Sequence, residues 1–333
     1  TTCGWMMWNW LMSSLFFGAK IGLYEGSPAY PSATDFMKKL SDLEFSIIGT
    51  SPKFLKALEL EGYNNQHSFS HLETILSTGS PLLDENFDFV YDKIKSQVHL
   101  ASISGGTDIL GCFMLGNPLK KVERGYIQGA GLAMDIAAFS QDGKSLIGEK
   151  GELGCLQPFP SMPLGFLNDL DQKKFKEAYF SKFENIWCHG DFIEIKANGG
   201  IKVFGRSDAT LNPGGVRIGT AEIYHQVEKC DFVQDSLCVG KSVDGDVDIY
   251  LFILLRNDEI LNDEKINQIK KTIRLNTTPR HVPKYIYQVK EIPYTRSGKK
   301  MELVIAHLLS NIEIKNKEAI MNPWSLAEYE KFK

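Results

Sequence analysis

Residues 72–81 read LETILSTGSP, a short apolar run that ends in small residues and a proline. Residues 45–49 and 97–104 form apolar runs of the same kind. Ser51-Pro52 follows the first of these runs, and serine before proline in the first turn is a helix start signal. Short apolar strands that alternate with helices predict a parallel sheet with crossover helices, an α/β fold. We expect strands over 20–24, 45–49, 72–77 and 97–104, and helices over 52–60 and up to residue 94.

The residues that follow two of these strands are small and polar. In parallel sheets, ligands bind beyond the carboxyl ends of strands, which is where Gly79 and Gly105 fall. Thr107 and Asp108 come next after the second strand. A hydroxyl beside a carboxylate suits Mg²⁺ and phosphate oxygens. Alternatively, Thr107 and Asp108 cap a helix.

From about Gly111 the chain becomes rich in glycine and in β-type residues. Residues 191–205 alternate apolar and polar side chains and break at Asn198-Gly199-Gly200, which predicts a hairpin. A boundary at Arg206-Ser207-Asp208 precedes a pattern typical of a small α+β unit. Its expected elements are helices over 221–228 and 263–275 and strands around 237–239, 249–255 and 285–289. We therefore expect a large domain over residues 1–207 and a small domain over residues 208–333.

Two segments at and beyond this boundary concentrate positive charge. Residues 293–300 read PYTRSGKK, which is either a basic turn on a solvated face or a mobile loop that carries Lys299 to a phosphate or carboxylate. It is not a Walker A motif, because Pro293 and Lys300 stand where that motif needs Gly and Ser or Thr. Residues 205–217 read GRSDATLNPGGVR. Their arginines could grip phosphates bidentately, or the segment is a hairpin end followed by a loop.

Residues 187–191 read WCHGD and place the carboxylate of Asp191 at the start of a strand. This carboxylate could accept hydrogen bonds from sugar hydroxyls, or it is an ordinary turn aspartate. Cys188 and His189 are disfavoured as a metal-binding pair, because adjacent strand residues point to opposite faces.

Composition excludes several classes of protein. The chain has 333 residues and a net charge of -4, which gives no electrostatic footprint for nucleic acid or for an anionic membrane. Its six cysteines are scattered singly, so neither a disulfide framework nor a zinc site is indicated and a cytoplasmic location is favoured. Residues 5–21 are very apolar but short and interrupted, which favours a buried helix over a membrane span. We expect that residues preceding this helix are missing.

Together and in this order, the motifs resemble those of the acyl-adenylate-forming family of acyl-CoA synthetases, adenylation domains and luciferases. The resemblance covers essentially the whole chain but only the C-terminal half of the family's usual length, and it implies the corresponding half of that fold. The matching segments are 105–108 (the Thr-Glu motif, with Asp in place of Glu), 151–153 (Gly-Glu-Leu), 189–191 (Thr-Gly-Asp), 205–208 (the Gly-Arg-x-Asp hinge), 213–223 and 295–299 (the lysine loop).

The resemblance implies a reaction in two half-steps with ATP, Mg²⁺ and CoA. A carboxylate attacks the α-phosphorus of ATP to give an acyl-adenylate and pyrophosphate, and the CoA thiol then expels AMP. The implied catalytic residues are Lys299, Arg217 and Thr107, with Asp108 at the metal. Those implied for nucleotide and CoA binding are Gly79, Ser80 and Pro81 at the adenine, Asp191 and Arg206 at the ribose, and Arg274 at the CoA 3′-phosphate. Asp208 is the implied hinge of the small domain.

The acid is expected to be acetoacetate. Residues 1–9, 104–108 and 322–326 are similar to those of family members that activate it. Acetyl-CoA synthetases carry tryptophans just before the Thr-Glu motif, where this chain has Ser104 and Gly105, and a lost indole would leave room for a longer acid. The alternatives are another short or medium acid, or a non-catalytic fragment. The family's phosphate loop is absent from these residues, so we expect the chain to be inactive alone.

Overall fold

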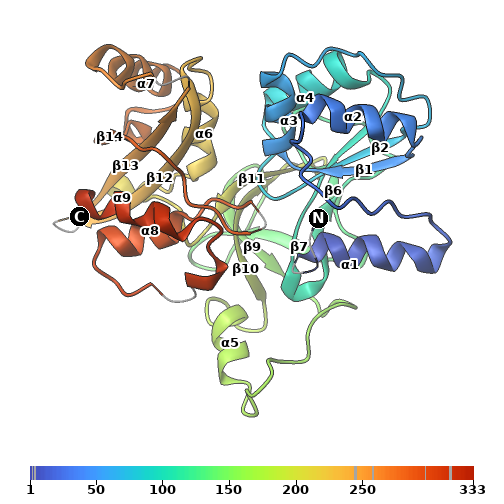
Figure 1. Cartoon of the computed structure of the whole chain (residues 1–333). Helices are drawn as coiled ribbons and strands as arrows, with labels where there is room; N and C mark the ends of the chain where they lie inside the picture. Colours follow the sequence, from blue (N-terminus) through green and yellow to red (C-terminus); the bar gives the residue numbers. More distant parts are fainter. Residues whose placement is uncertain (2, 4, 244–245, 257–258, 297, 315–316) are drawn as a thin grey trace. The chain divides into compact units, whose positions relative to one another are not determined.

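The computed structural model describes residues 1, 3, 5–243, 246–256, 259–296, 298–314 and 317–333 (Figure 1). Three residues of the predicted motifs, Thr2, Gly4 and Ser297, lie outside these described residues. The chain divides into two compact units: Thr1–His189 with Ile193–Val203, and Gly190–Phe192 with Phe204–Lys333. The domains expected over residues 1–207 and 208–333 stay a prediction.

The first unit contains the predicted parallel sheet. Its order is β1 (Ile47–Thr50), β2 (Thr74–Ser77), β3 (His99–Ser102), and both pairings are parallel. One face carries Ile48, Ile75 and Leu100, which pack against α2 (Ala33–Asp42), α3 (Pro52–Leu60) and α4 (Asp84–Phe89). Figure 1 shows these helices beside the sheet. The opposite face carries Leu76 and Ala101 and contacts α1 (Met6–Ser13). The α/β prediction is confirmed, because alternate residues of each strand face two apolar layers.

Helix α3 begins at Pro52, where the sequence Ser51-Pro52 predicts a helix start. The Ser51 hydroxyl accepts a hydrogen bond from the Phe54 amide (3.3 Å), and Pro52 occupies the first turn. Leu55 and Leu58 form its buried stripe. The cap satisfies an amide that the helix leaves open, so this boundary is set by the residues at the helix start.

Two further sheets follow the parallel sheet along the chain. One sheet has the order β4 (Ser104–Gly106), β5 (Gly111–Leu115), β6 (Gly129–Ala130). The other has the order β11 (Ile201–Arg206), β10 (Trp187–Ile195), β9 (Lys150–Cys155), β7 (Ile136–Phe139), β8 (Ser145–Leu146). The predicted hairpin corresponds to β10 and β11. Helix α5 (Lys173–Tyr179) lies between β9 and β10 in sequence, and its Phe175 and Tyr179 are buried with Trp187.

The second unit is a sheet with both faces covered (Figure 1). Its order is β12 (Val233–Val243), β13 (Asp246–Leu255), β14 (Tyr285–Gln288). Ile249, Leu251 and Ile253 pack with α6 (Thr220–Val227) and α7 (Asp263–Asn276). Tyr250 and Phe252 point the other way and pack with α8 (Glu302–Leu309) and α9 (Leu326–Tyr329). The period of two along β13 therefore separates two apolar layers.

Two expectations for the N-terminal segment are wrong. Residues 20–24 form no strand. Residues 5–21 do not form a buried helix: α1 is followed by a 3₁₀ turn over Ser14–Phe17, and Met6 is the one buried residue of the two elements. Phe16 and Phe17 are 88% and 84% exposed, because no described part of the chain covers them. None of the described helices is long and apolar enough to cross a membrane.

Candidate active site

The loop after β2 places Gly79, Ser80 and Pro81 at the carboxyl edge of the parallel sheet, as predicted. Gly79 has φ +101°, a backbone conformation that favours glycine. A Cβ there would lie 3.8 Å from the Trp5 ring, so the loop also runs close to the start of α1. Ser80 is exposed and Pro81 is half-buried. The loop is thus open to a flat ligand, and its role at an adenine stays a prediction.

The empty space expected beside Gly105, which an indole would fill, is not present. Gly105 pairs with Cys112 across β4 and β5. A Cβ at Gly105 would overlap the carbonyl oxygen of Gly111 and lie 2.5 Å from the Cα of Cys112. The direction in which an indole would project is therefore filled by the backbone of β5. At neighbouring Gly106, a Cβ would lie 2.5 Å from Nε2 of His189, so glycine serves close packing at both positions.

Thr107 and Asp108 lie directly beyond β4 and are exposed. They belong to a 3₁₀ turn, Thr107–Ile109, whose N-cap is Gly106, and no side chain caps it. The alternative that they cap a helix is therefore wrong. The hydroxyl of Tyr179 donates a hydrogen bond to Asp108 Oδ2 (2.6 Å), and the Tyr179 ring stacks on Trp187 at 3.7 Å and 13°. The carboxylate is thus oriented by a fixed ring, a contact that the sequence did not predict.

The donor set at Asp108 fits a magnesium ion that is also held by a nucleotide. Among the described residues, no three His, Cys, Asp or Glu side chains gather into a metal-binding group. Mg²⁺ commonly uses one or two carboxylates and takes its other ligands from phosphates and water. One oriented carboxylate beside the Thr107 hydroxyl is therefore a sufficient protein contribution.

Glu152 of the Gly-Glu-Leu segment is a structural residue of the first unit. Its side chain is 2% exposed and forms an ion pair with Lys182. Lys182 follows α5 in the chain, so the pair joins the α5 segment to β9. Removing one partner of such a pair would leave a buried charge without compensation.

In the second unit, the structure brings Asp191, Arg206 and Asp208 together. Arg206 Nη1 lies 3.6 Å from Asp191 Oδ1, and Nη2 lies 3.3 Å from Asp208 Oδ2. The Asp191 side chain is 10% exposed, whereas those of Arg206 and Asp208 are 47% and 42% exposed. Gly190 allows this arrangement, since it has φ +82° and a Cβ there would lie 2.6 Å from Arg206 Nη2. The cluster presents a carboxylate acceptor whose charge is balanced by a guanidinium.

Arg217 contacts Phe192, the residue that follows Asp191 in β10. Its guanidinium carbon is 4.7 Å from the centre of the Phe192 ring, a cation–π distance. The loop before Arg217 is held by Arg280, whose Nη1 donates to the carbonyl oxygen of Gly214 (2.9 Å). The motifs that contain Asp191 and Arg206 thus meet in this unit, and the segment after the predicted hinge contacts the neighbouring residue Phe192.

Lys299 is exposed on a tight turn. The Thr295 amide donates to the Lys299 carbonyl oxygen (2.9 Å), and the Lys299 amide donates to Thr295 Oγ1 (3.0 Å). Gly298 has φ +79°, which explains glycine before the lysine. Arg274 is exposed in the last turn of α7, on a different element. Its role at CoA stays a prediction.

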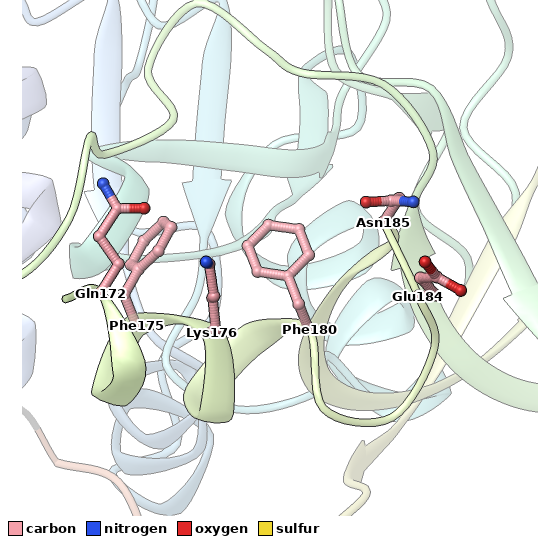
Figure 2. Close-up of a pocket in the computed structure, with 6 residues that line it drawn as sticks. All are labelled: Gln172, Phe175, Lys176, Phe180, Glu184 and Asn185. Carbon is pink, nitrogen blue, oxygen red and sulfur yellow. The ribbon is translucent and has the colours of Figure 1, made fainter.

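A separate pocket of about 330 Å³ lies along α5 in the first unit (Figure 2). Figure 2 shows Phe175, Lys176 and Phe180 on the same side of this segment. The lining residues are Gln172, Phe175, Lys176, Phe180, Glu184 and Asn185. None of the predicted site residues lines this pocket.

Comparisons with known proteins show which proteins this chain is similar to. No family model matches the chain. The acetoacetyl-coenzyme A synthetase of Rhizobium meliloti (strain 1021) is 51% identical over 98% of this chain and 50% of its own length. The chain is similar to one half of an acetoacetyl-CoA synthetase. The acetoacetyl-CoA synthetase of Xenopus tropicalis is 45% identical over 99% of this chain and again 50% of its own length. The chain thus spans about half the length of the curated relatives it matches.

Solved structures confirm the fold. An acetoacetyl-CoA synthetase from Streptomyces lividans matches with a TM-score of 0.90 and 34% identity, covering 99% of this chain and 52% of that one. The anthranilate CoA ligase AuaEII matches with a TM-score of 0.71 and 20% identity, over 85% of this chain and 53% of that one. The chain has the fold of the C-terminal half of the adenylate-forming enzymes, as the resemblance of its motifs to that family implied.

Proposed function

We propose that this chain forms the C-terminal half of a ligase that joins acetoacetate to CoA at the expense of ATP. The observation that carries the proposal is the 51% identity, along almost the whole chain, with a protein named acetoacetyl-coenzyme A synthetase. The geometry supports it, because Asp191 pairs with Arg206 from a separate motif, and Arg217 contacts Phe192, the residue after Asp191 in β10. The substrates are small molecules, with no nucleic acid or membrane involved. Five of the six cysteines are buried thiols, which suits the cytoplasm.

Asp191 is the residue we assign to the ribose of ATP. Its buried carboxylate offers acceptor oxygens to two hydroxyls, and Arg206 balances the charge at 3.6 Å. Charge-assisted hydrogen bonds of this kind are about twice as strong as neutral ones. The loop Gly79, Ser80 and Pro81 would flank the adenine. Each of these contacts would help to orient the nucleotide.

Lys299 and Arg217 are the cations we assign to the first half-reaction. Attack of the acid on the α-phosphorus spreads negative charge over the phosphate oxygens, which fixed cations stabilise. Thr107 would donate its hydroxyl to a phosphate oxygen, and Asp108 would hold Mg²⁺, which supplies further charge neutralisation. Both side chains are exposed beyond β4 and therefore available to a ligand.

Asp208 is the residue about which we expect the small domain to turn between the half-reactions. Domain rotations are absorbed by a few residues at the ends of elements. Asp208 lies two residues beyond Arg206, the last residue of β11, and its carboxylate contacts the exposed Arg206 guanidinium at 3.3 Å. After the turn, CoA would attack the acyl carbon and release AMP, with Arg274 near its 3′-phosphate.

Acid-dependent exchange of pyrophosphate into ATP tests this function. The protein is the product of the complete reading frame, and the panel is acetate, acetoacetate, butyrate and hexanoate. Acetoacetate should give the fastest exchange. Faster exchange with another acid would contradict the substrate assignment, and no exchange with any acid by folded protein would favour a non-catalytic chain. Residues 1–333 expressed alone should form no acyl-adenylate, since they span half of the relatives' length.

A further inference from the structure

A charged network lies beneath the turn that carries Lys299, and the proposed reaction does not use it. Asp235 of β12 receives two side chains: Lys300 Nζ lies 3.0 Å from its Oδ1, and the Tyr294 hydroxyl donates to its Oδ2. Lys300 Nζ also donates to the carbonyl oxygen of Ser236 (2.6 Å). The side chains of Lys300 and Asp235 are only 17% and 19% exposed.

Both members of the pair are charged at neutral pH. Burial alone would lower the pKa of Lys300, but the carboxylate of Asp235 and the nearby Glu228 and Glu302 raise it. Burial likewise opposes ionisation of Asp235, yet Lys300 holds the pKa of that carboxyl below its usual range. The ammonium also lies 4.0 Å from the centre of the Tyr224 ring. The charges therefore stabilise one another inside the fold.

The two residues that contact Asp235, Tyr294 and Lys300, stand at the two ends of the turn that carries Lys299. Tyr294 and Lys300 face each other as an antiparallel bridge, and the turn between them closes through Thr295 and Lys299. Adjacent residues of an extended arm point to opposite sides. Because Lys300 points inward to Asp235, Lys299 must point outward, and it is exposed.

The sequence Lys299-Lys300 leaves the register of this turn ambiguous, because the Asp235 carboxylate alone could pair with either lysine. A shift of one residue would send Lys299 to Asp235 and turn Lys300 outward. The Tyr294 hydroxyl removes the ambiguity, since it fixes the opposite end of the turn on the second oxygen of the same carboxylate. An apolar pair could stabilise the fold equally well, but it would not choose between the two lysines.

We propose that Asp235 is a positioning residue that, through Tyr294 and Lys300, sets the register of the turn and directs Lys299 outward. This rests on the proposed role of Lys299 in the first half-reaction. Asp235 itself touches no substrate.

The test uses the double variant Asp235→Asn/Lys300→Met in the product of the complete reading frame. Removing both charges leaves neither member of the pair buried without its partner, and Glu302 keeps its hydrogen bond from the Tyr224 hydroxyl (3.0 Å), so the protein should still fold. Tyr294→Phe is the milder second variant, and it keeps the ring. Lys284→Met is the matched control, because it breaks the exposed pair of Lys284 with Asp248 (2.7 Å) in the same unit.

Four readouts separate positioning from stability: kcat of pyrophosphate exchange, KM for ATP, thioester formation and amide hydrogen exchange. For both test variants, kcat of pyrophosphate exchange should fall, by about 100-fold in the double variant, as a misplaced group typically causes. KM for ATP and thioester formation from supplied acyl-adenylate should stay within about twofold of the parent protein. Amide hydrogen exchange of Thr295, Gly298 and Lys299 should become faster. The control should change none of these.

Two outcomes would overturn the proposal: an unchanged rate of pyrophosphate exchange in the folded variants, or an equal fall in the rates of both half-reactions. If the parent protein itself catalyses no pyrophosphate exchange, the proposed function fails, and amide exchange alone decides. Faster amide hydrogen exchange at the turn would then still support the positioning role of Asp235, and unchanged amide hydrogen exchange would refute it.

Discussion

The two units hold their predicted site residues in different ways. In the second unit, side chains from separate motifs hold one another, as Arg206 does between Asp191 and Asp208. In the first unit, the backbone does most of this: Gly79 has a left-handed conformation and Gly105 packs against β5. Asp108 is the exception, because Tyr179 orients it. Substitutions in the second unit should therefore affect individual chemical steps, whereas glycine substitutions in the first should affect the fold.

The largest effect is expected for Lys299→Ala. It should raise the activation free energy of adenylation by about 3 kcal/mol or more, because a charge partner of the transition state is lost. Thioester formation from supplied acyl-adenylate should be largely spared. The two half-reactions are measured separately by pyrophosphate exchange and by CoA consumption. Equal damage to both would contradict a role for Lys299 in one step, and with it the difference drawn between the two units.

Asp208→Pro should separate the half-reactions in another way. Proline fixes φ near −65°, so one orientation of the small domain should be trapped. One half-reaction should survive while the other falls about 100-fold, roughly 2.7 kcal/mol. Asp208→Ala is the matched control, because it removes the contact with Arg206 and leaves the backbone free. Normal rates of both half-reactions in the proline variant would show that Asp208 is not the hinge.

Gly105→Ala should act on folding. The added Cβ would overlap the β5 backbone, so we expect a loss of about 2 kcal/mol in the free energy of unfolding, measured with urea. The matched control is Gly49→Ala in β1, where a Cβ would have no neighbour within 4 Å. If Gly105→Ala is as stable as the control and changes the choice of acid, Gly105 lines the acid pocket after all.

The smallest effect is expected for Tyr179→Phe. The variant keeps the stacked ring and loses one hydrogen bond to Asp108, a loss of about 1 kcal/mol. The Mg²⁺ concentration needed for half-maximal adenylation should rise several-fold, while thioester formation stays unchanged. Tyr30→Phe is the control, since Tyr30 is 75% exposed. An unchanged Mg²⁺ requirement would separate Asp108 from the metal.

Local patterns predicted most of the elements. The cap of α3 at Ser51, the strand β13 and the extent of α7 depend on neighbouring residues, and the predicted boundaries lie within a few residues of those observed. Contacts between distant segments were missed. Tyr179 and Asp108 are 71 residues apart in the chain. The space beside Gly105 depends on the register of β4 against β5, and the exposure of Phe16 depends on what covers α1.

The candidate site follows the same division. The motifs identified Asp191, Arg206 and Arg217 because their residue types suit nucleotide binding, and the structure pairs Asp191 with Arg206. The supporting residues Tyr179 and Asp235 carry no such signature, because an isolated tyrosine or aspartate is ordinary in any sequence. Their importance appears only where the fold places them against Asp108 and Lys300.

The most direct test of the central claim is product analysis of the complete reaction. The product of the complete reading frame is supplied with ATP, Mg²⁺, CoA and acetoacetate, and nucleotides and thioesters are quantified together by mass spectrometry. We predict that acetoacetyl-CoA forms with one AMP and one pyrophosphate per thioester, since the reaction passes through an acyl-adenylate. Formation of ADP and phosphate with the thioester, or no acetoacetyl-CoA from folded protein, would contradict it.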